Sequence, residues 1–222
     1  MGYNATTWCF WSKFLDFEKN RGKKVIELGN QMIKRSLAKI LGINECQSRE
    51  YFGKMGLKCT TLDILGGNNV IAMDLSVKIK SENLLNQFDI LTNAGTTEHV
   101  EPFENQMICF NNIHNFVKKD GIMLHSVPAV GSYKNHCSIY YTTEFFEELA
   151  KSNNYEIVYL DKKYTGIAKH LIFACLKKTS DDNFVKDEKT FTECLIYHRS
   201  KKKKARDKVV RKLQFELQQR GK

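Results

Sequence analysis

Three acidic residues of the sequence lie at or near the ends of short apolar runs. Glu27 lies two residues before Gly29, and Asp63 and Asp74 each end a later run. If these runs are neighbouring strands of a parallel sheet, their ends meet at one edge of it. Ligands of open α/β sheets bind outside the carboxyl ends of the strands. The spacing therefore predicts a ligand site along that edge.

Histidines and one further acid follow the later apolar runs. Glu98 and His99 end a polar stretch, His125 lies in the next apolar run, and His136 lies in the loop beyond it. A histidine titrates near neutral pH and can take a proton from an alcohol, phenol or amine. We expect His136, His99 and Glu98 to be the catalytic residues. The alternative for each histidine is a structural hydrogen bond in a loop.

Aromatic residues of the same loop region complete the expected acceptor side. We expect Tyr133, Tyr140 and His125 to contact the substrate. A divalent metal held by Glu98 and the three histidines is an alternative that the residue types allow. No spacing specifies such a site, so we assign no metal ligand.

Apolar runs alternate with helical patterns along most of the chain. Strands are expected at 23–28, 58–63, 70–74, 88–92, 122–127, 156–160 and 170–176. Helices are expected at 1–20, in two pieces of 31–56 with Ser48 as the N-cap of the second, at 102–117 and at 143–152. The alternation predicts an α/β fold with a parallel sheet covered on both faces.

The length of 222 residues suits one large α/β domain. Residues 1–20 form the expected N-terminal helix, whose Trp8 and Trp11 pack on the core or cover the cofactor pocket. The domain itself is expected at 21–178. Residues 179–222 are expected to form a charged C-terminal extension that ends in a basic helical tail.

The basic character of the chain is concentrated near its end. Nine Lys or Arg and one Asp between 199 and 212 give +8 of the total charge of +10. Such a tail suits contact with nucleic acid or an anionic surface, or it is a solubilising end. Seven cysteines without a Cys-x-x-Cys pair predict reduced thiols and a cytoplasmic protein. The apolar runs are too short for a transmembrane segment.

The turn VIELG, followed by acids after the second and third strands, resembles the cofactor site of class I S-adenosylmethionine-dependent methyltransferases. The resemblance implies that Glu27 and Gly29 approach the methionine part of the cofactor. It implies that Asp63 accepts both ribose hydroxyls, that Asp74 accepts the adenine amino group, and that Leu75 packs on the adenine. A glycine admits this close approach.

The resemblance also implies cofactor contacts for Leu28, Asn30 and Ile64, which adjoin these residues, and for Asn93 and Gly95, which follow the fourth expected strand. The sequence departs from the family at two points. Asn30 and Gln31 stand where fuller family turns have further glycines. An expected inserted helix over 32–46 lengthens the distance from Glu27 to Asp63.

Three longer segments resemble a subgroup of uncharacterised bacterial and viral methyltransferase-domain proteins: FDILTNAGTTEHV, NQMICFNNIHNFVKKDGIMLHSVP and HCSIYYTTEFFEELA. The whole resemblance covers residues 23–176. It implies a Rossmann-like, seven-stranded, mostly parallel sheet with helices on both faces and a closing antiparallel strand pair.

The activity that the resemblance implies is methyl transfer from S-adenosyl-L-methionine to a hydroxyl or amine. We expect a small polar acceptor, such as a sugar (glycan) or metabolite, held in line with the sulfonium and deprotonated by a histidine base. The sequence specifies neither the acceptor nor the oligomeric state.

Two other functions remain open. An RNA or DNA methyltransferase would use the basic tail, but no Asn/Asp-Pro-Pro-aromatic word follows the fourth strand and no Pro-Cys pair is present. A non-catalytic Rossmann-like binding module is compatible with the sparse glycines. A nicotinamide-dependent oxidoreductase would need a G-x-G-x-x-G turn, which residues 27–33 do not provide.

Overall fold

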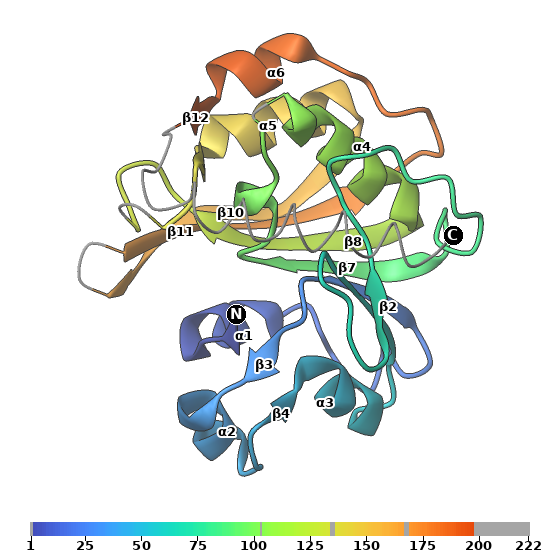
Figure 1. Ribbon diagram of the computed structural model, residues 1–222, viewed down its shortest axis with the longest axis vertical. Helices are drawn as coiled ribbons and strands as arrows, with labels where there is room; N and C mark the ends of the chain where they lie inside the picture. The colour runs from blue at the N-terminus through green and yellow to red at the C-terminus, as the bar shows by residue number, and fades with distance from the viewer. Residues whose placement is uncertain (1, 103, 134–135, 167–168, 198–222) are drawn as a thin grey trace.

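A seven-stranded sheet forms the centre of the computed structural model, which describes residues 2–102, 104–133, 136–166 and 169–197 (Figure 1). The strand order is β10-β11-β8-β7-β2-β5-β6. The parallel strands are β2 (Lys24–Leu28), β5 (Lys58–Asp63), β6 (Val70–Ala72), β7 (Phe88–Ala94) and β8 (Val117–Pro128). The strands β10 (Tyr155–Gly166) and β11 (Lys169–Lys178) add the closing antiparallel pair.

Helices cover both faces of this sheet, so the domain has three layers (Figure 1). On one face lie α4 (Asn105–Phe116), α5 (Thr143–Ser152) and α6 (Glu188–Glu193). On the other lie α1 (Ala5–Trp11), α2 (Arg35–Leu41) and α3 (Ser48–Lys54). The predicted Rossmann-like fold class is confirmed, since strand–helix alternation leaves apolar sheet faces that helices must cover.

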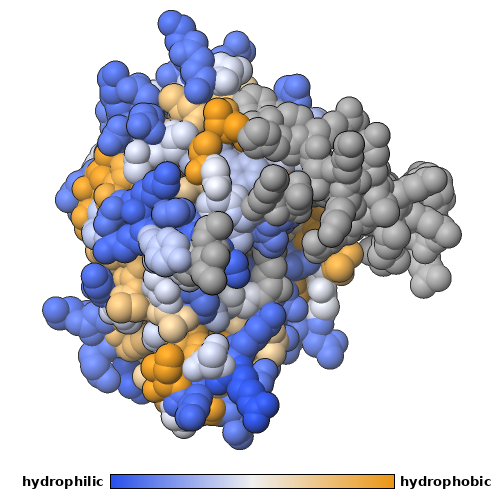
Figure 2. Space-filling model, turned by 90° about the vertical axis from the view of Figure 1, so that its left-hand side faces the viewer, coloured by the Kyte–Doolittle hydropathy of each residue, from blue (hydrophilic) through white to orange (hydrophobic). Residues whose placement is uncertain are grey.

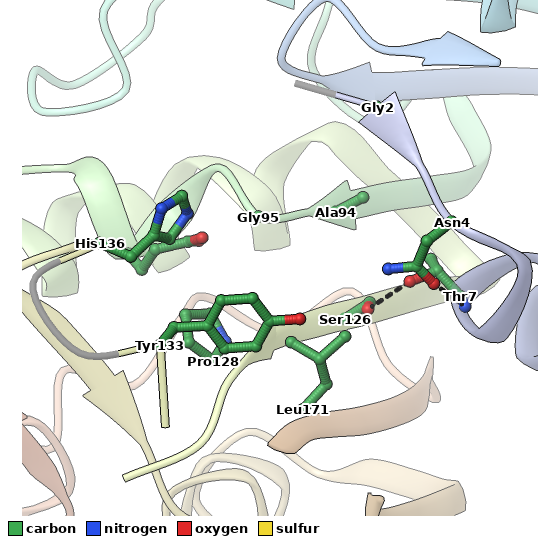
Figure 3. A pocket seen from close by; sticks show the side chains of 11 residues that line it. Gly2, Asn4, Thr7, Ala94, Gly95, Ser126, Pro128, Tyr133, His136 and Leu171 are labelled. Carbon is green, nitrogen blue, oxygen red and sulfur yellow. Dashed lines mark hydrogen bonds between the residues drawn. The ribbon is translucent and has the colours of Figure 1, made fainter. Parts of the chain in front are cut away.

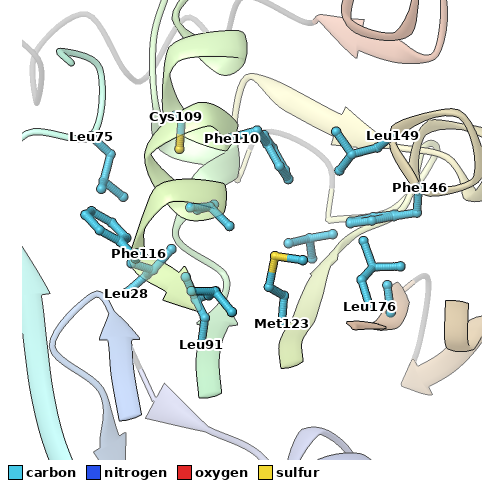
Figure 4. Close-up of a cluster of buried hydrophobic side chains, with 14 of the residues drawn as sticks. Leu28, Leu75, Leu91, Cys109, Phe110, Phe116, Met123, Phe146, Leu149 and Leu176 are labelled. Atoms are coloured by element: carbon cyan, nitrogen blue, oxygen red, sulfur yellow. The ribbon is translucent and has the colours of Figure 1, made fainter. Parts of the chain in front are cut away.

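Each layer of helices has its own apolar core against the sheet. The larger core contains the buried aromatic rings of α4 and α5, together with strand residues such as Leu91 and Met123 (Figure 4). The smaller core contains the buried Trp8 and Trp11 of α1 and Phe52 of α3. The N-terminal helix therefore packs on the domain, but it spans Ala5–Trp11 and not the expected residues 1–20.

Short strands add two small sheets beside the main one. The first joins β1 (Gly2–Tyr3), β3 (Met32–Ile33) and β4 (Cys46–Gln47). It ties the start of the chain to the segment that follows β2. The second joins β9 (Ile139–Tyr141) to β12 (Leu195–Tyr197). Both small sheets lie where the sequence shows no clear period-2 pattern.

The expected boundary at residue 178 needs correction. Phe184, Phe191 and Leu195 are buried in the larger core, and β12 pairs with β9. Residues 179–197 therefore belong to the folded domain. Their three buried apolar residues are dispersed in a charged sequence, which is why the sequence alone does not predict this. The basic stretch 199–212 and the expected helical end lie outside the described residues.

The break between the second and third helices is confirmed, but its cap is not. Gly42 ends α2 in the left-handed conformation, with a φ of 66°. Ser48 is not the N-cap of α3: Gln47 holds that position, and Ser48 is the first helical residue. The Ser48 hydroxyl is engaged elsewhere, in a hydrogen bond to a buried carboxylate described below.

The surface is mixed in character. The face on the left of Figure 1 presents many hydrophilic residues with hydrophobic patches among them (Figure 2). Among the described residues, no helix is both long and apolar enough to cross a membrane. All seven cysteines lie in described parts of the chain and none forms a disulfide.

Candidate active site

A cavity of about 180 Å³ opens at the carboxyl ends of β7 and β8. Figure 3 shows His136 and Tyr133 on one side of it and Asn4 and Thr7 on the other. The complete set of lining residues is Gly2, Asn4, Thr7, Ala94, Gly95, Glu98, Ser126, Pro128, Tyr133, His136 and Leu171. Four of these, Gly95, Glu98, Tyr133 and His136, are residues that the sequence pointed to.

Glu98 reaches the cavity from a short 3₁₀ turn, η1 (Thr97–His99), just after β7. Buried hydrogen bonds hold this turn in place. Asn93 Nδ2 donates to Thr97 Oγ1 (2.9 Å), and Gln106 Nε2 donates to the Thr97 carbonyl (2.8 Å). The Tyr141 hydroxyl also donates to Thr97 Oγ1 (2.9 Å). Only 1% of the surface of Glu98 is exposed to solvent. Its position is therefore held by the hydrogen bonds to Thr97, the residue before it in the chain.

His136 comes from the loop between β8 and β9. Its backbone N–H donates to the Tyr133 carbonyl (2.9 Å), and the Tyr140 hydroxyl donates to the same carbonyl (3.0 Å). The His136 ring lies 5.2 Å from the His99 ring, centroid to centroid. The structure therefore brings together the three residues that we expected to be catalytic.

The acids of the expected cofactor side lie along the same edge of the sheet. Asp63 Oδ2 accepts the backbone N–H of Asn30 (2.9 Å), and Oδ1 accepts that of Leu65 (3.0 Å). Asp74 Oδ1 accepts the N–H of Ser76 (2.8 Å). Both acids are half-buried. Since β2, β5 and β6 are neighbouring parallel strands, their ends and these two carboxylates form one row.

Gly29 makes the turn after β2 and allows a close approach of chain segments. Its φ is +79°, and a Cβ there would lie 2.5 Å from Thr96 Oγ1 and 2.9 Å from Gln31 Nε2. Thr96 Oγ1 in turn donates to the Leu28 carbonyl (2.7 Å). The turn therefore joins the expected cofactor side to the loop after β7.

Replacing Gly29 by alanine is expected to destabilise the domain more than replacing Gly42. Both residues have positive φ, which costs about 1–2 kcal/mol with a Cβ. Only Gly29→Ala also collides with neighbours, which adds about 1–3 kcal/mol, because nothing lies within 4 Å of a Cβ at Gly42. Chemical unfolding of the two variants measures the difference. Equal losses would contradict the close approach.

The side chain of Glu27, at the turn that we expect to approach the cofactor, is engaged inside the protein. Glu27 is fully buried, and hydroxyl groups of Tyr3, Ser48 (2.5 Å) and Thr61 (3.1 Å) donate to its carboxylate. Burial raises the pKa of this carboxyl to about 7, against the lowering effect of those hydrogen bonds. The side chain ties the N-terminal strand β1 to β2, β5 and α3.

Several other residues that we expected to contact a ligand are buried and contact other parts of the protein instead. His125 is fully buried, and desolvation lowers its pKa to about 3, so it faces neither substrate nor metal. Its Nδ1 pairs with Asn93 Nδ2 (3.1 Å), which makes Asn93 a buried support of η1. Tyr140 is buried and supports Tyr133. The side chain of Leu28 is in the larger core.

The two apolar residues expected beside the cofactor differ in exposure. Ile64 is 39% exposed, next to Asp63 at the end of β5. Leu75 is buried in the larger core. We therefore withdraw the expectation that Leu75 packs on an adenine.

The N-terminal segment lines the cavity, which the sequence did not predict. Thr7 Oγ1 and Ser126 Oγ form a buried hydrogen bond of 3.0 Å, so α1 is tied to β8 at the cavity (Figure 3). Asn4 caps α1 by accepting the N–H of Thr7 (2.8 Å). An N-cap asparagine is a readable signal for the helix start, but no sequence pattern links residue 7 to residue 126.

No family model and no curated protein matches the sequence. Solved structures are similar in fold. The 1,6-didemethyltoxoflavin-N1-methyltransferase of Burkholderia thailandensis is 18% identical, with 79% of each chain covered and a TM-score of 0.54. The N-methyltransferase NodS of Bradyrhizobium japonicum is 11% identical, with 79% of this chain and 86% of that chain covered and a TM-score of 0.53.

A third similar structure is phosphoethanolamine N-methyltransferase 2 of Haemonchus contortus. It is 12% identical, with a TM-score of 0.54, and the match covers 79% of this chain and 52% of that chain. All three structures contain S-adenosylhomocysteine. The strand order, the two helical layers and these likenesses agree: the chain has the fold of the class I S-adenosylmethionine-dependent methyltransferases.

Proposed function

We propose that this protein transfers the methyl group of S-adenosyl-L-methionine to a hydroxyl or amine of a small polar acceptor. One observation carries the proposal. The cavity lined by Glu98 and His136 opens at the sheet edge along which Gly29, Asp63 and Asp74 also lie. Cofactor and acceptor would therefore meet at one place.

The reaction follows from the groups at that place. The acceptor oxygen or nitrogen attacks the methyl carbon bound to the sulfonium, a bond to the methyl group forms, and the carbon–sulfur bond breaks. The electron pair of that bond stays on sulfur, which leaves neutral S-adenosylhomocysteine. His136 or His99 takes the acceptor proton, and Glu98 stabilises the positive charge on the imidazole. The positive charge of the sulfonium is thereby lost, and the proton of the acceptor passes to the imidazole.

The size of the cavity supports a small acceptor. Its volume of about 180 Å³ is below the roughly 300–1,000 Å³ of pockets for drug-sized ligands. Gly2, Asn4 and Thr7 close one side of it, which disfavours a bulky chain. Two of the similar proteins hold small acceptors in their structures, 1,6-didemethyltoxoflavin and phosphomonomethylethanolamine.

Replacing Asp63 by alanine is expected to weaken binding of S-adenosylhomocysteine about 100-fold. A hydrogen bond to a charged group is worth about 1.5–3 kcal/mol, and Asp63 also orders the turn at Asn30. Asp74→Ala is expected to weaken binding about tenfold, because one hydrogen bond from the adenine amino group is lost. Titration calorimetry with S-adenosylhomocysteine measures both affinities.

The exposed Asp181, which lies outside these strand ends, supplies the control. Asp181→Ala should bind as tightly as the unchanged protein. If the unchanged protein does not bind S-adenosylhomocysteine at high micromolar concentration, the chain is a non-catalytic module. If it binds and both strand-end variants retain full affinity, the cofactor lies elsewhere.

A further inference from the structure

The side chains of Glu98, His99 and His136 converge on one point beside the cavity. One ligand atom from each, a carboxylate oxygen or an imidazole nitrogen, lies within 4.8 Å of the other two. Glu98 is buried, His99 is half-buried and His136 is exposed. This set is the only group of three such residues that the described part of the chain brings this close.

We propose that Glu98, His99 and His136 bind a divalent first-row transition-metal ion, whose open positions face the cavity and take an oxygen of the acceptor. Two imidazoles and one carboxylate form a ligand set that such ions accept. Three protein ligands leave positions for water or substrate, which is the pattern of catalytic metal sites.

The spacing of the atoms, which is that of a long ion pair, leaves room for an ion between them. His99 Nε2 and Glu98 Oε1 lie 3.7 Å apart, whereas a charge-assisted hydrogen bond is about 2.7–2.9 Å long. In a tetrahedral site, bonds of about 2.0–2.2 Å to one ion place two ligand atoms roughly 3.3–3.6 Å apart. The three ligand atoms, which lie within 4.8 Å of one another, therefore need to approach by up to about 1.5 Å to close on an ion.

The elements that position the three side chains also suit a metal site. Glu98 sits on η1, which Asn93 and Gln106 fix through buried hydrogen bonds to Thr97. The exposed His136 comes from a different loop and supplies the third ligand from the open side. A rigid buried carboxylate and an accessible imidazole give an ion both a fixed anchor and a route of entry.

The chemistry of the ion would sharpen the reaction proposed above, on which this step rests. A coordinated hydroxyl is more acidic, as coordinated water is. The acceptor hydroxyl would lose its proton to solvent water, and its oxygen would then form the bond to the methyl carbon as the carbon–sulfur bond breaks. The two imidazoles are then ligands, and no protein base is needed. This favours an oxygen acceptor, with a second oxygen nearby to chelate the ion.

Metal binding is tested directly on the full chain after removal of metals with a chelator. Titration calorimetry with MnCl₂ and ZnCl₂, and the visible spectrum with CoCl₂, should show one equivalent bound. Glu98→Gln, His99→Asn and His136→Asn should each weaken binding at least about tenfold. The control His170→Gln, in β11 and outside the cluster, should bind as the unchanged protein does.

Because His136 is exposed, His136→Asn should fold normally, and its thermal melting curve checks this. Binding that is absent, or unchanged in both the His99 and His136 variants, would overturn the metal site. Turnover of an acceptor that persists unchanged in EDTA would overturn its role and leave the histidine base. One bound equivalent in a protein that does not bind S-adenosylhomocysteine would refute the proposed function alone.

Discussion

Replacing His136 by alanine is expected to slow methyl transfer by about 10²–10⁴-fold while leaving the affinity for S-adenosylhomocysteine unchanged. A positioned proton acceptor contributes a factor of this size. The same loss is expected if His136 holds an ion, because the acceptor hydroxyl then loses its activation. Cofactor affinity is spared because His136 lines the acceptor cavity, whereas Asp63 and Asp74 lie at the ends of β5 and β6.

The measurement is single-turnover transfer of a labelled methyl group to a small hydroxylated acceptor, with cofactor affinity measured separately. His99→Ala should lower the rate as well, since its ring neighbours that of His136. His170→Gln is the matched control, a histidine outside the cavity. Full rates in both the His136 and His99 variants would rule out the acceptor site described here.

Replacing Glu27 by glutamine is expected to remove a loss of stability that grows as the pH rises from 4.5 to 7. Burial raises the pKa of Glu27 to about 7 in the folded protein, from a usual value of 4.5. Between these values the folded state holds a proton that the unfolded state has lost. The contribution of Glu27 to the free energy of unfolding therefore falls as the pH rises through this window, by about 3 kcal/mol in all, while the buried His125, whose pKa is lowered, has the opposite effect. Above pH 7 the loss is complete.

Glu27→Gln is neutral at every pH, and its amide keeps an acceptor oxygen for the Tyr3 and Ser48 hydroxyls. Its gain in stability over the unchanged protein should therefore grow from pH 4.5 to 7 and be largest above pH 7. Glu27→Ala leaves the buried hydroxyls without this acceptor and should be less stable than Glu27→Gln throughout. Urea unfolding from pH 4.5 to 8 measures the curves, with the exposed Glu147→Gln as the control. Parallel curves for both glutamine variants would show that Glu27 does not titrate in this window.

The sequence by itself determined the architecture of this protein. Apolar runs of strand length alternate with helical patterns, and this leaves little choice but a parallel sheet with helices on both faces. The pattern also locates the strand ends, so it places Asp63 and Asp74 along one edge of the sheet. The α5 boundaries, Thr143–Ser152, follow from the Thr142 cap and the apolar face of the helix.

Tertiary packing decided which polar residues reach the site and which support it. Glu27 and His125 have the residue types of a site, yet both are fully buried, since β2 and β8 are interior strands of the sheet and helices cover both of its faces. The three aromatic and aliphatic anchors of residues 179–197 are too widely spaced to show a period, and only their contact with the larger core reveals them.

The cluster of Glu98, His99 and His136 depends most clearly on the tertiary structure. Glu98 and His99 are adjacent in the chain, but His136 comes from a loop 37 residues later and from the next strand of the sheet. No periodicity connects them. Their meeting depends on the parallel pairing of β7 and β8, which brings the two strand ends to the same edge, and on the hydrogen bonds that fix η1 there.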